Sequence, residues 1–329
     1  MHDQTATQVG ATLSRDNAAR FQIPSLRAAL WQLANTFLPY FLLWFAMVRA
    51  LAISYWLVLP LAVLAAGFLT RIFIIFHDCG HASFFQSRRA NNITGIVAGM
   101  LNLTPYRHWR WQHALHHGTA GDLDRRGTGD MWTLTVHEYL ASTTRVRLAY
   151  RLVRNPIVLF VVAPLYTFVI HHRFASSAAP ARERSSVWKT NAALLGLTVL
   201  MSMVIGFRAF VLIQLTISAI AGAVGLWLFY VQHQFDGAYW ARSAAWNFDA
   251  AALEGSSFYK LPRILQWFTG NIGFHHIHHL NPRIPNYKLE RCHEADPYYR
   301  TIKPLTLLSS LRSLTFRLWD ERLQAYVGF

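Results

Sequence analysis

Gly270-Asn-Ile-Gly-Phe-His-His-Ile-His-His-Leu280 is the stretch around which the rest of the chain is organised. It carries four histidines within five residues. Residues three and four apart share one face of a helix, so His275, His278 and His279 point one way and His276 points another. Three imidazoles directed at one point are what a transition-metal site requires. The alternative is a polar helix end whose histidines contact water.

The same spacing recurs earlier in the chain and favours the metal hypothesis. His113-Ala-Leu-His-His117 repeats the pattern His-x-x-His-His, and His77-Asp-Cys-Gly-His81 places two histidines at i and i+4. These eight histidines, with His233 as a ninth, exceed what one metal ion can hold, so two metals sharing them are predicted. Imidazole suits iron, copper and zinc alike, but a closed structural zinc site, commonly with cysteine ligands, does not fit.

Four long apolar runs explain how the distant clusters can meet. They cover residues 28–48, 51–76, 187–207 and 209–231, and each has about the length that crosses a bilayer as a helix. The short connection within each pair predicts two helical hairpins. The second run leads straight into His77 and the fourth into His233, so this topology places all the clusters on one side of the membrane.

The charge distribution predicts which side that is. The chain has 31 Lys+Arg against 16 Asp+Glu, and residues 88–154 alone contain ten arginines. Basic loops lie on the cytoplasmic side of membrane proteins, which puts this loop and the N-terminus there. The arginines are scattered between apolar segments without a nucleic-acid-binding module, so a nucleic-acid partner is not expected. Two cysteines, Cys79 and Cys292, give no disulfide framework.

Shorter segments complete the prediction. Residues 1–21 are polar and expected to be poorly ordered, without a cleavable signal peptide. Residues 92–104 have the apolar spacing of an interfacial helix, and residues 156–170, which include Pro164, predict an interfacial or re-entrant piece rather than a span. In the C-terminal region, Pro304 is expected to begin a final helix with an apolar stripe that extends to Leu318.

The predicted fold is therefore an all-α membrane protein in which four transmembrane helices and a cytoplasmic helical cap hold a di-metal centre. The expected parts are an N-terminal cytoplasmic tail (1–27), a first transmembrane hairpin (28–76), a cytoplasmic loop with the first two histidine clusters (77–186), a second hairpin (187–231) and a C-terminal cytoplasmic cap with the third cluster (232–329).

The chain resembles the membrane fatty acid desaturases, and most closely the bacterial acyl-lipid desaturases of the omega-6 type. The resemblance covers roughly residues 30–292 and includes Phe229-Tyr-Val-Gln-His-Gln-Phe-Asp236 and Asn281-Pro-Arg-Ile-Pro-Asn-Tyr287 beside the three histidine clusters. It implies a non-haem di-iron oxidoreductase of fatty acid biosynthesis that uses O2 to place a double bond in a lipid acyl chain. It also implies an integral, multi-pass protein with both termini cytoplasmic, in a bacterial inner membrane.

The resemblance further implies the metal ligands. One iron is expected on His77, His81, His117 and His279, and the other on His113, His116, His233, His275 and His278. Candidate partners for the second ring nitrogens are Asp78, Asp122, Asp124, Asp236 and Glu254. Where animal relatives have an asparagine one turn before the extra histidine, this chain has Phe229, and Asn271 is the candidate substitute. The other histidines, expected not to bind metal, are His2, His108, His137, His171, His172, His276 and His293.

No haem or iron–sulfur cysteine pattern is present in the sequence, so the expected electron donor is a separate protein of the ferredoxin or cytochrome b5 type. Two alternatives remain open at this point. A related di-iron hydroxylase or acetylenase uses the same first hydrogen abstraction. A non-catalytic membrane metal-binding protein has the metal without the reaction.

Overall fold

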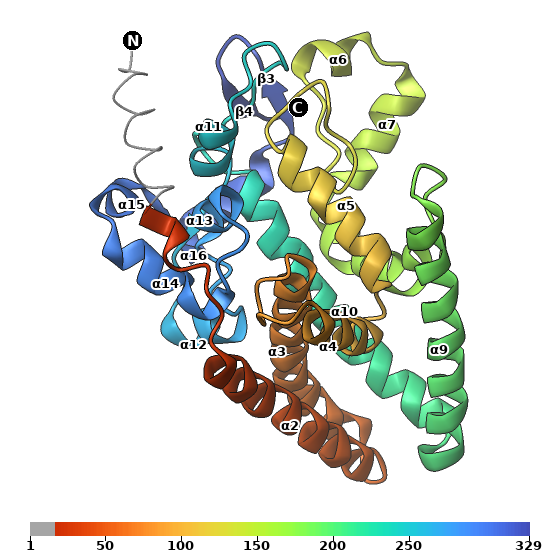
Figure 1. Ribbon diagram of the computed structural model, residues 1–329. Helices are drawn as coiled ribbons and strands as arrows, with labels where there is room; N and C mark the ends of the chain where they lie inside the picture. The colour runs from red at the N-terminus through yellow and green to blue at the C-terminus, as the bar shows by residue number, and fades with distance from the viewer. Residues whose placement is uncertain (1–16) are drawn as a thin grey trace.

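The computed structural model describes residues 17–329 and is built around four long helices (Figure 1). Each is long and apolar enough to cross a membrane: α2 (Leu26–Leu51), α3 (Tyr55–Gly80), α9 (Ala181–Ile205) and α10 (Phe207–His233). The four predicted apolar runs are thus confirmed as helices. Most of their ends lie a few residues beyond the runs, because polar residues continue the helices there, but α3 begins four residues later than its run and α9 ends two residues earlier.

The two hairpins form as the sequence predicts. Ser25 and Ser54 cap the N-termini of α2 and α3, where their hydroxyl oxygens accept hydrogen bonds from backbone N–H groups. Between α9 and α10 the chain turns at Gly206, whose φ of +89° suits glycine. The helix α9 is only 6% buried over its most apolar window, so its side chains face outward, whereas α3 is 61% buried at the centre of the bundle.

Four helices follow the first hairpin: α4 (Arg88–Leu101), α5 (Tyr106–Thr119), α6 (Val136–Ala141) and α7 (Thr144–Val153). The predicted amphipathic helix is confirmed as α4, which exposes Ile93 and Val97 and buries Ala98 in the core with α2, α3 and α10. Its Gly95 lets α5 approach closely, because a Cβ there would lie 2.3 Å from the ring of Tyr106.

A broken helical element covers the segment with Pro164. It consists of η1 (Val158–Val162), α8 (Ala163–Leu165), η2 (Tyr166–Ile170) and η3 (His171–Arg173), and it is bent by 61° relative to α7. The pair is either one broken span or a re-entrant piece, so residues 17–329 contain four helices that can span a membrane, or five with this pair. Pro164 packs against α10 beside Gly222.

The C-terminal region, residues 234–329, folds over one end of the long helices (Figure 1). Its helices are short: α11 (Phe248–Leu253), α12 (Arg263–Phe268), α13 (His275–Leu280), α14 (Asn286–Ala295), α15 (Pro297–Thr301), α16 (Leu307–Ser310) and η4 (Leu311–Thr315). Two small sheets join them, a parallel pair of β1 (Phe258–Tyr259) with β2 (Pro304–Leu305) and an antiparallel pair of β3 (Leu318–Asp320) with β4 (Ala325–Val327).

Two expectations about the chain ends are wrong. Pro304 lies in β2 instead of starting a helix, and Leu318 is buried in β3, so no continuous apolar stripe links them. Pro304 is extended because it pairs with Phe258 of β1, and a proline is tolerated at the first residue of a strand. Residues 17–21, expected to be poorly ordered, pack against the C-terminal region: Ala18 is fully buried, and the Asn17 amide donates to Asp296. Residues 1–16 lie outside the described part of the chain.

Polar contacts fix the C-terminal region on the first hairpin. The backbone N–H of Asn286, at the start of α14, donates to Asp78 Oδ2 at 2.6 Å, and its side-chain amide donates to the same oxygen at 2.8 Å. The Gln32 amide of α2 donates to the side-chain oxygen Oδ1 of Asn286 at 3.0 Å. The Tyr287 hydroxyl accepts from the backbone of Ser25. The segment after the third histidine cluster therefore docks on the end of α3, which brings α13 to the first cluster.

Candidate metal centre

Four segments bring the nine predicted ligand residues together where the long helices meet the C-terminal region. The end of α3 supplies His77, and His81 is its C-cap. The helix α5 supplies His113, His116 and His117 from adjacent turns, α10 ends at His233, and α13 supplies the last three. A helix places i, i+3 and i+4 side chains on one face, so each short cluster turns its rings toward the region where the four segments meet.

The ring nitrogens fall into two adjoining groups. In the first, five residues have potential ligand atoms within 4.8 Å of one another: His77, His81, His113, His117 and His278. Within it, His117 Nε2 lies 3.1 Å from both His113 Nε2 and His278 Nε2. In the second, His116, His233 and His279 meet the same criterion. His275 joins them, since its Nε2 lies 3.0 Å from His233 Nε2.

This grouping differs from the division that the resemblance implies. His113 and His278 lie with the first group rather than the second, and His279 lies with the second rather than the first. The helix explains part of the difference, because His113 and His117 are one turn apart on α5 and cannot easily face different centres. The ring of His279 stacks on that of His117 at 4.1 Å between centroids, so the two groups share a boundary.

Burial keeps these imidazoles in the form that binds metals. His275, His278 and His279 are 3% exposed or less. Burial, with a smaller contribution from charge repulsion between neighbouring histidines, lowers the pKa of His81, His113, His117 and the three α13 residues well below the ordinary histidine value. A depressed pKa means that the ring is neutral at pH 7, which leaves one nitrogen lone pair free for a cation.

The donor set fits transition metals. Both groups consist of imidazoles alone, which excludes the oxygen-rich shell of Ca²⁺ or Mg²⁺. The buried Nε2 atoms of His81 and His279 have no hydrogen-bond partner among the described residues. Buried polar atoms are normally paired, so these two nitrogens are available to bind a metal ion.

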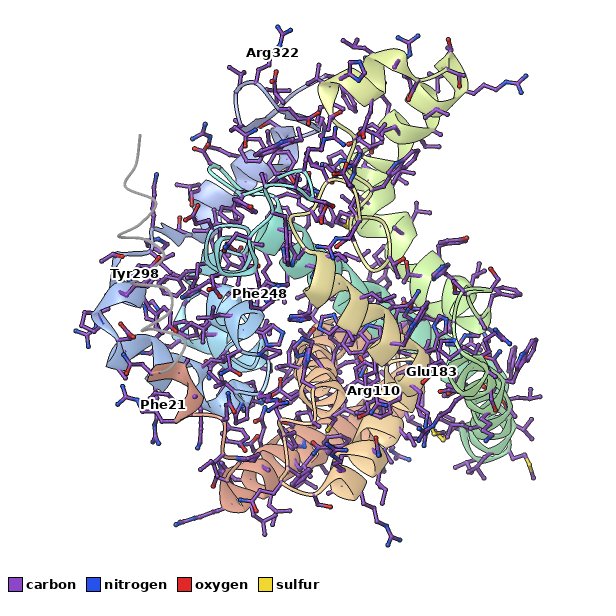
Figure 2. The ribbon with its side chains drawn as sticks, turned by 45° about the horizontal axis from the view of Figure 1, so that its top comes forward. Phe21, Arg110, Glu183, Phe248, Tyr298 and Arg322 are labelled. Atoms are coloured by element: carbon purple, nitrogen blue, oxygen red, sulfur yellow. The ribbon has the colours of Figure 1, made fainter. Side chains whose placement is uncertain are left out.

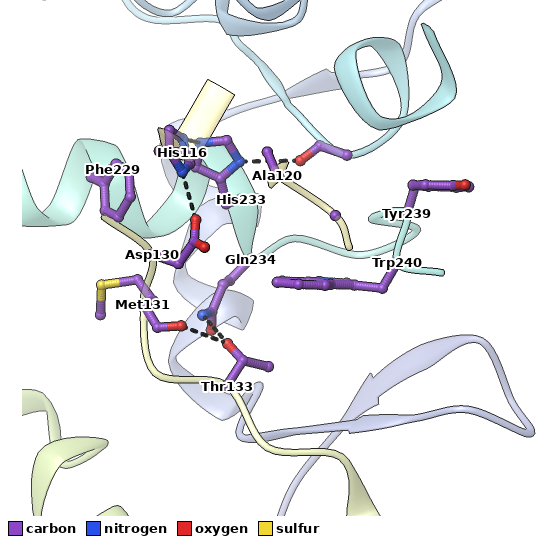
Figure 3. Close-up of a pocket in the computed structure, with 12 residues that line it drawn as sticks. His116, Ala120, Asp130, Met131, Thr133, Phe229, His233, Gln234, Tyr239 and Trp240 are labelled. Carbon is purple, nitrogen blue, oxygen red and sulfur yellow. Dashed lines mark hydrogen bonds and ion pairs between the residues drawn. The ribbon is translucent and has the colours of Figure 1, made fainter. Parts of the chain in front are cut away.

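Three of the rings are oriented through their second nitrogen. His77 Nδ1 lies 3.2 Å from Asp78 Oδ1, and the other oxygen of this carboxylate is held by Asn286. His233 Nδ1 lies 3.3 Å from the Gly255 carbonyl oxygen. His116 Nδ1 lies 2.5 Å from Asp130 Oδ1 (Figure 3). Such contacts fix the tautomer, so Nε2 is left as the metal-facing atom.

Asp130 is the residue that sequence reasoning missed. It lies on the loop between α5 and α6, fourteen positions after His116, with no periodicity to reveal it. Arg126 holds this loop by donating to the backbone oxygens of Leu123 and Thr133, and Gln234 donates to the Thr133 hydroxyl (Figure 3). Burial opposes ionisation of Asp130, but the contact with His116 and the Gly127 N–H outweigh it, and its pKa falls below the usual value.

Most of the other carboxylates that were candidate partners for the second ring nitrogens interact with residues outside the two histidine groups. Asp122 pairs with Arg125, and Asp124 pairs with Arg242. Asp236, expected beside His233, is exposed and pairs with Arg312 instead. The reason is that the helix ends at His233, so the backbone carries Asp236 away from the ring. The backbone carbonyl of Glu254 accepts from Tyr239.

Asn271 does not take the role of the family asparagine. Its φ is +60°, and its amide donates to the backbone oxygen of Asn286, so the side chain faces α14. Phe229 occupies the corresponding position, with its ring 5.2 Å from that of His116 and 5.3 Å from that of His233. The cavity next to these rings is only about 10 Å³, too small for an acyl chain. An apolar ring thus covers this side of the second group.

The other histidines have separate surroundings. His276 points away from both groups, as the helical spacing predicts, and lies fully buried against His293 and Tyr299. His108 accepts from the backbone of Ser176, and His172 contacts the Thr104 hydroxyl. His137 and His171 are exposed, and His2 lies outside the described residues.

Replacing Asp130 by asparagine is expected to weaken metal retention. The amide can still accept from His116, but it lacks the negative charge that makes the imidazole a stronger ligand, and changes of this kind cost about 10- to 100-fold in metal affinity. Metal remaining after graded chelator treatment measures the effect. Asp124→Asn is the matched control, because that carboxylate pairs with Arg242 at the surface. Equal retention of metal by the two variants would show that Asp130 does not stabilise metal binding.

Comparison with known proteins gives consistent matches. The family model described as fatty acid desaturase matches residues 54–304. A fatty acid desaturase of Bacillus subtilis (strain 168) is 49% identical over 329 residues, which is 100% of this chain and 93% of that protein. An sn-1 oleoyl-lipid 12-desaturase of Synechocystis is 28% identical over 72% of this chain and 68% of its own length. A temperature-sensitive sn-2 acyl-lipid omega-3 desaturase (ferredoxin) of Arabidopsis thaliana is 28% identical over 78% of this chain and 62% of its own length.

Proposed function

The chain belongs to the fatty acid desaturase family, and from this premise we propose that it is an O2-dependent oxidoreductase that introduces a double bond into the acyl chain of a membrane lipid. The observation that carries the proposal is the set of buried imidazoles in two adjoining groups at the ends of apolar helices. Two iron ions are the proposed occupants. Their proposed ligands are His77, His81, His113, His116, His117, His233, His275, His278 and His279.

The reaction removes one hydrogen from each of two adjacent chain carbons. With O2, two electrons and two protons it gives a carbon–carbon double bond and two molecules of water. Iron, when bound, supplies the oxidation of an unactivated C–H bond, which no side chain can perform.

The residues of the chain supply positioning and exclusion of water. Asp78, Asp130 and the Gly255 carbonyl hold three ligand rings in fixed orientations. Phe229 covers the second group with an apolar ring. A fixed geometry in a dry site favours removal of a second hydrogen over transfer of oxygen to the carbon.

The substrate and the electron source are proposed from the relatives and from composition. The names of two relatives describe desaturases that act on lipid-bound acyl chains. The name of one of them also includes ferredoxin. The chain has two cysteines, both buried, and therefore too few for an iron–sulfur cluster of its own. A separate ferredoxin or cytochrome b5 type of donor is the proposed partner. The arginines of residues 88–154 support a cytoplasmic position for this region.

Mass spectrometry of the fatty acids of a host that expresses the chain tests the proposal. We expect new species two mass units lighter than their saturated parents, and none in the empty-vector strain. A gain of sixteen units indicates the related hydroxylase. A triple bond, which fragmentation of a derivative distinguishes from two double bonds of the same mass, indicates an acetylenase. If the protein binds iron but forms no new fatty acid and consumes no O2 when electron donor and lipid are supplied, the remaining hypothesis is a non-catalytic metal-binding protein.

A further inference from the structure

A cavity of about 690 Å³ lies beside the first histidine group, where His81 lines it. The chain before α2, the segment after α3, the first turns of α4, α5 and the segment after α13 all contribute to its wall, and His81 is part of that wall. The lining residues Gln86 and Arg88 are exposed, so the cavity opens to the surface. Its volume is in the range of sites that bind small molecules.

The lining is strongly basic. Arg88, Arg110 and Arg283 contribute to it, and none of the described lining residues is acidic. Arg110 donates a long hydrogen bond, 3.4 Å, to the side-chain oxygen of Asn92, and its guanidinium carbon lies 5.7 Å from the centre of the Tyr106 ring. Within residues 17–329, Arg88 and Arg283 form no ion pair. Three guanidinium groups that converge on one cavity without a counter-charge favour an anionic ligand.

The cavity lies at the border between apolar and polar surface. Ile23 lines it and is 65% exposed. The helix α4, whose first residue Arg88 lines the cavity, exposes Ile93 (54%) and Val97 (47%) on its outer face. An exposed apolar face on a short helix with a basic start is typical of a helix that lies in the headgroup region of a bilayer. An anion bound here therefore lies at the depth of lipid headgroups.

We propose that Arg88, Arg110 and Arg283 bind the phosphate of a glycerophospholipid whose acyl chain is the substrate. The proposal rests on the proposed desaturase function and adds the class of headgroup. Guanidinium groups bind phosphate oxygens through paired, charge-assisted hydrogen bonds. A neutral sugar headgroup leaves all three charges without a partner, so the site discriminates phospholipids from glycolipids.

A concave site of this volume suits a headgroup better than a protein partner. A protein electron donor buries a broad surface, about 800 Å² on each partner in a standard complex. Here the charges converge within a cavity. Free inorganic phosphate shares the chemistry of the headgroup and is separated from it by the experiment.

The first experiment measures binding to the purified, iron-loaded protein in neutral detergent. The probes are dihexanoyl phosphatidylglycerol, dihexanoylglycerol without phosphate, and inorganic phosphate. We expect the phospholipid to bind at least about tenfold more tightly than either of the others, because the phosphate-free lipid lacks the charge-assisted hydrogen bonds and inorganic phosphate lacks the contacts of the glycerol and acyl groups. Arg88→Gln and Arg283→Gln each weaken only the phospholipid, by about tenfold. Arg322→Gln, an exposed arginine far from Arg110 (Figure 2), removes the same charge and leaves binding unchanged.

The second experiment measures desaturation of phosphatidylglycerol and of a galactolipid in vesicles. The two glutamine variants are expected to raise KM about tenfold for the phospholipid, with kcat retained and the galactolipid unaffected. Equal binding of the phosphate-free lipid, or of inorganic phosphate, overturns the assignment. If the glutamine variants bind lipid unchanged but are reduced more slowly by the electron donor, the arginines bind a protein partner instead, and the assignment is overturned. Absence of desaturation by the unmodified protein rejects the proposed function, while the binding experiment still decides the headgroup site.

Discussion

Replacement of His233 by alanine is expected to reduce desaturation by more than about 100-fold. His233 lies outside the three histidine clusters, yet its Nε2 is 3.2 Å from His116 Nε2 and 3.0 Å from His275 Nε2. It therefore links α5 to α13 within the second group. Alanine removes one ligand and leaves a gap at the end of α10, and the geometry of a metal oxidant depends on every ligand position.

The measurement compares unsaturated product and bound iron at equal membrane levels of each variant. His137→Ala is the control, because His137 is exposed on α6 and lies outside both groups. His276→Ala is less suitable as a control than its sequence position suggests, since His276 is fully buried and its truncation leaves a cavity. Full activity of His233→Ala, with iron content unchanged, would remove His233 from the ligand set.

Removal of metal is expected to abolish activity entirely, and restoration is expected to require close to two iron ions per chain. The five imidazoles of the first group and the four of the second are too many for one ion, whose shell holds at most six ligands. Zinc is expected to occupy the same nitrogens without restoring activity, because it has no accessible redox change.

Iron titration of the chelated protein, followed by elemental analysis and product formation, gives the stoichiometry. Full recovery at one iron per chain would reject the two-metal arrangement. The zinc-loaded protein is the control, because zinc can occupy the same histidine ligands and restore the structure of the site but cannot transfer electrons. Recovery of activity with zinc alone would reject redox catalysis altogether.

The sequence predicts the histidine geometry well because helices impose short-range periodicity. The spacings within α5 and α13 determine which rings share a face, and the structure separates His276 from His275, His278 and His279 accordingly. The apolar runs likewise predict α2, α3, α9 and α10, since a bilayer requires a minimum length of apolar helix.

The parts that could not be predicted depend on contacts between distant segments. Asp130 meets His116 only because Arg126 and Gln234 hold the intervening loop. Asp236 has the right sequence position beside His233 but the wrong direction after the helix ends. Neither result is encoded in a local pattern.

The C-terminal region shows the same limitation in its secondary structure. Pro304 and Leu318 have a helix-compatible spacing, but pairing of β2 with β1 and of β3 with β4 decides their conformation. Propensity over a few residues is weak compared with such tertiary contacts.

The six-residue helix α13 has a consequence for how the protein is made. A helix of this length is not stable alone, so it forms only when it docks against α10, α11 and α14. It emerges from the ribosome after all four long helices have been synthesised. A nascent or truncated chain that ends before His275 has both hairpins but lacks three of the nine proposed ligand residues, His275, His278 and His279. The proposed metal centre can therefore be completed only after both hairpins and α13 have been synthesised.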